Sequence, residues 1–213
     1  MMPPGLRRPV LMLALALMAV ACGGDNPSVA FVGNDSCPTD GSVGAYSPSP
    51  PDVNSQPPVG QAISEMPHTH VAPPAKVQYL HNPPTSGCHY SLGGKVTPAP
   101  IQHGAYDKAI PAEYWVHNLE HGYIAVLYNC PGGGPSGCPD DFQKLRDWLH
   151  RQSPDPGGQA YSKIIILPWT TMQPKFALVS WDWYLPMQTL DINQVQRFYD
   201  NHVGKSPEGL ASP

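Results

Sequence analysis

Two histidines and a glutamate lie close together in the middle of this chain. The segment reads His117-Asn118-Leu119-Glu120-His121-Gly122 and runs directly into an apolar stretch over residues 123–128. In a helical turn, residues four apart lie on the same face, so His117 and His121 could both face one ion. Imidazole is the commonest metal ligand among side chains, and Glu120 could bind the ion or orient a ligand. The spacing therefore indicates a candidate metal site.

A second polar cluster lies upstream, at Asn82-Pro83-Pro84-Thr85-Ser86-Gly87-Cys88-His89-Tyr90. Its prolines and glycine predict a turn, because proline cannot donate to a strand ladder. We expect this turn to meet the helical segment. The expected metal ligands are then His89, His117, His121, His70 as a fourth, and Glu120 as a ligand or an orienting group.

The identity of the ion follows from the density of histidines. Seven of the nine histidines lie between residues 68 and 121, with Met66 and Cys88 nearby. Imidazole with nearby sulfur suits a transition metal ion. We expect copper, slightly ahead of zinc, bound for handling or sensing.

Two other functions stay open at this point. The His-x-x-Glu-His spacing is that of inverted zincins, in which both histidines bind zinc and the glutamate acts as a general base. Against a hydrolase, Gly122 would end the helix directly after His121, and the only later glutamate, Glu208, lies near the C-terminus. The third function is an interaction or scaffold domain of the cell envelope, in which the same polar groups form a buried hydrogen-bond network. An enzyme is not the favoured interpretation.

The elements that must position these residues form an α+β fold. We expect helices over residues 111–119, over residues 139–151 and after the cap Asp191, and strands over residues 76–80, 123–128, 163–167 and 176–184. This order predicts a small mixed or antiparallel sheet with two or three helices packed on it, all on one side. The long segment 90–110, rich in glycine and proline, is a candidate functional loop.

Composition supports a loop-rich domain and argues against one class of partner. The 213 residues include 28 prolines and 20 glycines, and the formal net charge is −4. Interior prolines break helices, so long helices are not expected. Nucleic-acid binding requires a basic surface, and we expect no nucleic-acid partner.

The N-terminus predicts export. Arg7-Arg8 precede a short apolar run over residues 11–20, which is too short to span a bilayer comfortably and is typical of a signal peptide over residues 1–21. Small residues before Cys22 resemble the bacterial lipobox, which implies a lipidated Cys22 and a membrane-anchored lipoprotein in the periplasm or outer envelope. An ordinary signal peptide is the alternative. We expect a disordered linker over residues 22–61, the folded domain over 62–205 and a flexible tail over 206–213.

Four more cysteines are expected to pair in an oxidising compartment. Cys130 and Cys138 flank a glycine-rich loop that lets them meet, and Cys37 with Cys88 is then the default second disulfide. The alternative leaves Cys88 as a free thiolate, a soft ligand for Cu(I) or zinc.

These motifs together resemble a bacterial family, the domain of unknown function three-one-zero-five. The resemblance rests on His70-Val71, Tyr79, Pro83-Pro84-Thr85-Ser86-Gly87-x-His89 and Val116-His117-x-Leu119-Glu120-His121-Gly122 before a strand that ends at Tyr128. It covers roughly residues 66–185. Cys88 departs from the family pattern, which commonly has proline there. The resemblance implies an exported or membrane-anchored protein and supplies no established activity.

Overall fold

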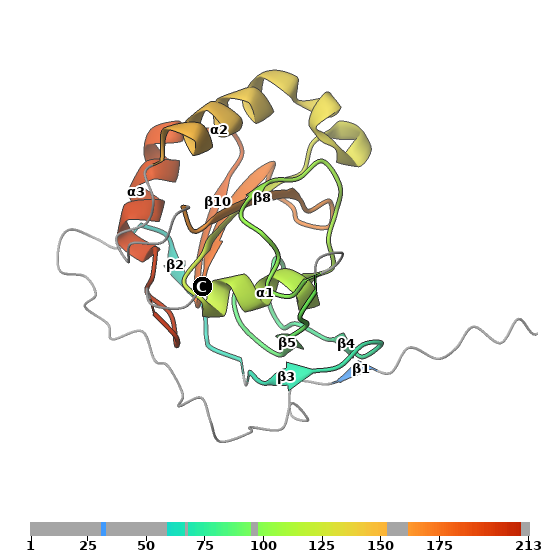
Figure 1. Cartoon of the computed structure of the whole chain (residues 1–213). Coiled ribbons are helices and arrows are strands. Elements are labelled where there is room, and N and C mark those ends of the chain that lie inside the picture. The colour runs from blue at the N-terminus through green and yellow to red at the C-terminus, as the bar shows by residue number, and fades with distance from the viewer. Residues whose placement is uncertain (1–30, 33–58, 67, 95–97, 153–161, 210–213) are drawn as a thin grey trace, which may run out of the picture.

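A six-stranded mixed sheet lies at the centre of the computed structural model, which describes residues 31–32, 59–66, 68–94, 98–152 and 162–209 (Figure 1). The strand order is β2-β10-β9-β7-β8-β6. Parallel pairing joins β8 to β7 and β6, and the other neighbours are antiparallel. The predicted α+β class with a mixed sheet is confirmed. The strands are β2 (Gln61–Ala62), β6 (Gly104–Ala105), β7 (Ile124–Tyr128), β8 (Ile164–Pro168), β9 (Phe176–Ser180) and β10 (Trp183–Met187).

The three predicted helices are present as α1 (Ala112–Glu120), α2 (Pro139–Arg151) and α3 (Ile192–His202). The carboxylate of Asp191 caps α3, as expected, by accepting from the backbone N–H groups of Asn193 and Gln194. Two short 3-10 turns, Pro131–Gly133 and Pro135–Gly137, precede α2. The predicted disulfide between Cys130 and Cys138 closes this loop.

The helices cover both faces of the sheet, which corrects the expectation that they lie on one side. Figure 1 shows α2 and α3 on one side of the strands and α1 on the other. Alternate residues of β7 and β8 supply two separate cores, and every residue of both strands is buried. Strands that are apolar at every position need cover on both faces.

The predicted strand 176–184 is a hairpin. The chain turns at Trp181 and Asp182, and β10 returns antiparallel along β9. Asp182 has φ of 60°, a left-handed conformation that aspartate and asparagine adopt more easily than most residues. The expected strand 76–80 is also shorter, with only β4 (Lys76–Val77) in strand geometry.

Short parallel pairs lie beside α1 on the face away from α2 and α3 (Figure 1). β1 (Phe31–Val32) pairs with β4, and β3 (His70–Val71) pairs with β5 (His89–Tyr90). The second pair places the backbone of His70 beside that of His89. This arrangement brings the upstream histidines next to α1.

Residues on both sides of the expected domain 62–205 also contact the folded part of the chain. Val59 already packs into the core that α3 covers, and His202 Nε2 lies 2.8 Å from its carbonyl oxygen. At the other end, residues 206–209 do not trail away from the domain, since Ser206 is buried and the backbone N–H of Glu208 donates to the carbonyl of Glu120. The predicted leader and Cys22 lie outside the described residues, as does most of the predicted linker. None of the helices within the described part of the chain is long and apolar enough to cross a membrane.

Candidate metal centre

The turn before β5 delivers His89 to the buried end of α1. Gly87 has φ of 121°, a conformation that favours glycine, and its carbonyl oxygen lies 2.8 Å from His89 Nδ1. Because a carbonyl can only accept, Nδ1 carries a proton, and the ring points its other nitrogen, Nε2, toward α1. Nε2 lies 2.9 Å from Glu120 Oε2, and the His89 side chain is fully buried. A metal ion between these two atoms would take the place of a shared proton.

His117 approaches the same carboxylate from within α1. Its Nδ1 lies 2.7 Å from the carbonyl oxygen of Tyr90, so this ring also turns Nε2 inward, 4.0 Å from Glu120 Oε2. Burial lowers the pKa of His117 to about 3, with His89 and His121 adding to the effect, against the opposite influence of the Tyr90 carbonyl and Glu120. His117 is therefore neutral at pH 7 and offers a lone pair, which metal binding requires.

Glu120 is the last residue of α1 and the common partner of the histidines. Burial raises the pKa of its carboxyl group, but the hydrogen bond from His89 and the charges of His89, His117 and His68 outweigh burial and hold the pKa at about 2. A carboxylate that is 1% exposed thus keeps its negative charge inside the protein. Such a charge needs a positive partner, and a divalent cation is one.

His70 completes the group from the solvent side. Its Nε2 lies 3.6 Å from Glu120 Oε2, and its side chain is 43% exposed, unlike those of His89 and His117. The ring lies 4.9 Å from the ring of His117, centre to centre. His70 therefore stands at the mouth of an otherwise buried site and gives an ion a route to solvent.

The geometry of these four residues fits a metal ion. One ligand atom from each of His70, His89, His117 and Glu120 lies within 4.8 Å of the others. Zinc–nitrogen and zinc–oxygen bonds of about 2.1 Å in a tetrahedron place ligand atoms about 3.4 Å apart. To close onto an ion, separations of up to 4.8 Å must shorten toward this value, and the 2.9 Å separation of His89 Nε2 and Glu120 Oε2 must lengthen. Both buried rings also have the backbone partners that fix metal-binding histidines in proteins.

His121 lies beside this group rather than within it. Its Nε2 lies 2.9 Å from Glu208 Oε2, and a second cluster of possible ligand atoms joins Glu120, His121 and Glu208. His121 follows the last helical residue, and its ring is perpendicular to that of His117. In this geometry His117 and His121 belong to different clusters, whereas an inverted zincin requires that both bind one ion.

A further pair of polar residues backs Glu120 from the other side. His68 Nε2 lies 3.8 Å from Glu120 Oε1, and His68 Nδ1 lies 3.4 Å from Glu65 Oε1. The indole of Trp181 donates to the same Glu65 oxygen at 3.0 Å. This chain of contacts orients the carboxylate of Glu120. Sequence reasoning missed Glu65 and Glu208, since neither lies in a motif with ligand spacing.

Neither nearby sulfur belongs to the four-residue group. Cys88 is buried and disulfide-bonded, so it offers no thiolate; its expected partner, Cys37, lies outside the described residues. Met66 Sδ accepts a hydrogen bond from the backbone N–H of Leu80 at 3.4 Å. The donors that converge are imidazole nitrogens and a carboxylate.

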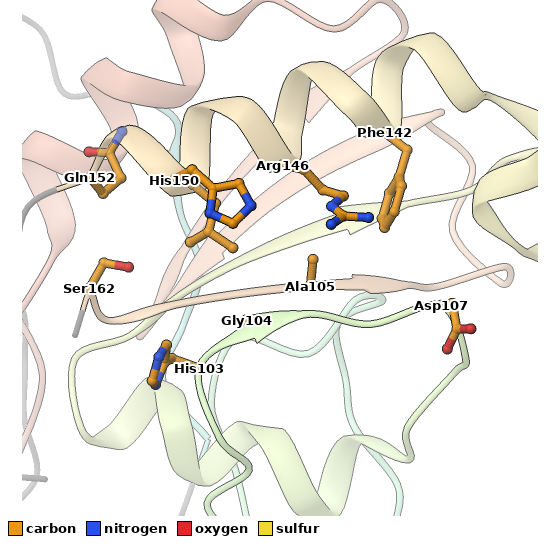
Figure 2. A pocket seen from close by; sticks show the side chains of 10 residues that line it. His103, Gly104, Ala105, Asp107, Phe142, Arg146, His150, Gln152 and Ser162 are labelled. Atoms are coloured by element: carbon orange, nitrogen blue, oxygen red, sulfur yellow. The ribbon is translucent and has the colours of Figure 1, made fainter.

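The remaining histidines of the dense window lie elsewhere. His81 packs on Tyr184, and His103 lines a cavity of about 610 Å³ between β6 and α2. Figure 2 shows that Arg146 and His150 of α2 face this cavity from the side opposite His103. Two of its lining residues, Gln152 and Ser162, border a segment that lies outside the described residues.

Comparison with known proteins identifies the family. The family described as "Protein of unknown function (DUF3105)" matches residues 70–213. The chain belongs to this family. The expected resemblance is thereby confirmed, and the match runs beyond residue 185 to include Glu208. No curated protein and no solved structure matches the chain.

Proposed function

We propose that this DUF3105 domain is a metal-binding module that holds one transition metal ion between His70, His89, His117 and Glu120. The observation that carries the proposal is the convergence of three imidazole Nε2 atoms on one buried, charged carboxylate oxygen. A hydrogen-bond network would satisfy Glu120 with one or two donors. Three imidazole nitrogens around one carboxylate oxygen are better satisfied by a shared cation than by protons alone.

The donors favour a divalent ion. Three imidazoles and a carboxylate suit Zn²⁺ or Cu²⁺, whereas Cu⁺ prefers the soft sulfur of cysteine and methionine. The expected preference for copper drew support from Met66 and Cys88, which bind other partners. We therefore propose zinc as the principal ion, with Cu²⁺ as its competitor.

The number of ligands argues for binding rather than catalysis at this ion. Structural zinc sites have four protein ligands, and catalytic sites keep one position open for water or substrate. Four protein donors would close the coordination sphere. The exposed edge of His70 lets the ion exchange, which suits metal handling or sensing.

We also propose that the domain works outside the cytoplasm, anchored to a membrane through a lipid on Cys22. The apolar leader, the small residues before Cys22 and the disulfide between Cys130 and Cys138 support export. Labelling cells with a tagged fatty acid should mark the wild type and not Cys22→Ala. An unlabelled wild type would leave an exported protein without an anchor.

Metal analysis of the purified, untagged protein tests the proposed function. We expect at least one zinc ion per chain, bound tighter than micromolar against a chelating indicator. His89→Gln should lose this ion, and His150→Gln, which removes an exposed histidine of α2, should keep it. A folded wild type that binds neither zinc nor copper would favour the scaffold interpretation, in which the same groups only hydrogen-bond.

A further inference from the structure

We infer that a second divalent ion binds directly beside the first, held by Glu120, His121 and Glu208, so that Glu120 bridges the two ions. This inference rests on the proposed function, because Glu120 is shared. One ligand atom from each of the three residues lies within 4.8 Å of the others, the same limit that the inner group meets. The two clusters overlap only at Glu120.

The fold places Glu208 at this position through its backbone. Gly204 donates from its backbone N–H to the carbonyl of Gly122 at 2.8 Å, directly after the end of α1. Further along, the N–H of Glu208 donates to the carbonyl of Glu120 at 3.3 Å. The segment after α3 is therefore tied to the end of α1 at two points, and the carboxylate of Glu208 is brought 2.9 Å from His121 Nε2.

An ion pair between His121 and Glu208 would account for that one distance. It does not involve the third member of the cluster, Glu120, whose carboxylate oxygen lies within 4.8 Å of the ligand atoms of both. Two carboxylates that close repel each other unless a positive charge lies between them. The buried ammonium of Lys163 is also close, and it donates to the backbone carbonyl of His121 at 2.9 Å. A divalent ion that took one oxygen from each carboxylate and the ring of His121 would neutralise both carboxylates at once.

A carboxylate has two oxygens, and each can bind a different ion. Two-metal sites in proteins hold their ions about 3.5–4 Å apart. Glu120 Oε2 faces His70, His89 and His117, and Oε1 lies 3.8 Å from His68 Nε2. An oxygen of Glu120 also belongs to the cluster with His121 and Glu208, and membership of both clusters is what a bridging carboxylate requires.

The two ions would differ in chemistry. The inner ion has four protein ligands, three of them buried, while the outer ion has three and lies beside Glu208, whose side chain is 35% exposed. Three protein ligands leave a position open for water or for a small oxyanion. The outer ion should therefore bind more weakly, exchange faster and accept an external ligand. One histidine and two carboxylates suit Zn²⁺, Co²⁺ or Mn²⁺.

Zinc stoichiometry of the full chain tests the inference with one variant and one control. Wild type should bind two zinc ions, the second more weakly, and Glu208→Gln should bind one. Asp200→Asn removes an exposed carboxylate of α3 and should bind two. If wild type binds one ion, the second site is overturned and the proposed function stands. If it binds none, the proposed function fails. If Glu208→Gln binds two, the second ion lies elsewhere.

Electron paramagnetic resonance of the Cu²⁺-loaded protein gives an independent readout. Two Cu²⁺ ions bridged by one carboxylate couple magnetically and give a half-field signal. We expect this signal in wild type and in Asp200→Asn, and its loss in Glu208→Gln, while the signal of an isolated Cu²⁺ remains. A wild type loaded with two Cu²⁺ ions that shows no coupling would overturn the shared Glu120 bridge.

Discussion

His89 Nε2 and Glu120 Oε2 lie 2.9 Å apart, although one residue follows a proline-rich turn and the other ends a helix. This contact joins the two sequence motifs in space. Other parts of the structure fix both partners. His89 Nδ1 contacts the carbonyl of Gly87, and Glu120 is the buried last residue of α1. The candidate metal centre depends on both supports.

Glu120→Gln should abolish tight metal binding while the domain stays folded. The amide has nearly the same shape as the carboxylate but lacks its charge, so affinity should fall by more than the roughly 10- to 100-fold typical of losing an outer partner. Isothermal titration with zinc measures this. Glu65→Gln is the matched control. Glu65 contacts Glu120 only through His68, so this variant should lower zinc affinity by no more than roughly 10- to 100-fold. Equal affinities for wild type and Glu120→Gln would remove Glu120 from the ligands.

Gly87→Ala should weaken both stability and zinc affinity. A Cβ atom there would lie 2.9 Å from Met66 Cε and 3.1 Å from the ring of Tyr79, in a backbone conformation with φ of 121°. Strain of this kind costs about 1–2 kcal/mol, and overpacking adds about 1–3 kcal/mol.

Gly94→Ala separates the two costs of Gly87→Ala. Gly94 has φ of 134°, and no atom of the described residues lies within 4 Å of an added Cβ, so the predicted cost is the backbone strain alone. In urea unfolding, the free energy of unfolding should be lower for Gly87→Ala than for Gly94→Ala. Zinc affinity should fall only in Gly87→Ala. Equal losses in both variants would show that the packing around Gly87 does not position His89.

Gly122→Ala should release the segment after α3 from the end of α1. The added Cβ would lie 2.5 Å from Gly204 Cα, a distance that the backbone cannot accept. Gly132 has nearly the same φ, 77° against 79°, and no atom in the described part of the chain lies within 4 Å of its added Cβ, so Gly132→Ala reports the strain alone. Hydrogen exchange over residues 204–209 should become faster in Gly122→Ala and stay unchanged in Gly132→Ala. Unchanged exchange in both would mean that this contact does not hold Glu208.

Asp182→Asn should stabilise the metal-free domain at neutral pH and flatten its pH dependence. Burial raises the pKa of Asp182 to about 8, against the Ser86 hydroxyl and with a further rise from Glu65. The folded state therefore keeps a proton that the unfolded state loses above about pH 4. The free energy of unfolding is therefore unaffected by Asp182 below about pH 4. It falls as the pH rises from about 4 toward 8, by at most about 1.4 kcal/mol per pH unit.

Urea unfolding in a chelator at pH 5 and pH 7.5 measures this effect. The wild type should be less stable at the higher pH, and the difference should shrink in Asp182→Asn. Asparagine also tolerates the φ of 60° at this position. Asp200→Asn, on the surface of α3, should keep the wild-type slope. Parallel slopes for wild type and Asp182→Asn would mean that Asp182 is charged in the folded protein.

The sequence was most informative where a local pattern reports a local structure. The amphipathic pattern of Leu145 and Trp148 and the cap at Asp191 predicted α2 and α3 correctly. The hairpin at Asp182 was missed because apolar alternation continues across it, and the left-handed conformation of one aspartate leaves no pattern. The cover on both faces was missed, although the unbroken apolar runs of β7 and β8 carry that signal.

The meeting of His89 with α1 could be expected, because two clusters of ligand-type residues in one domain often share a site. The role of Glu208 could not, since it depends on how the chain returns after α3 and on the close contact between Gly122 and Gly204. Such long-range placement follows from tertiary packing rather than from local spacing. The place of His70 was only partly predictable from the sequence. It depends on strand pairing with His89, and strands of two residues leave little pattern in a sequence.

Anomalous diffraction at the zinc edge, from crystals of the zinc-loaded protein, tests the central claim most directly. The account predicts a peak about 2.0–2.2 Å from Nε2 of His89 and His117 and from one oxygen of Glu120, with His70 closing the site. A well-ordered map with no peak between these atoms, or with zinc only on surface residues such as His150, would contradict it.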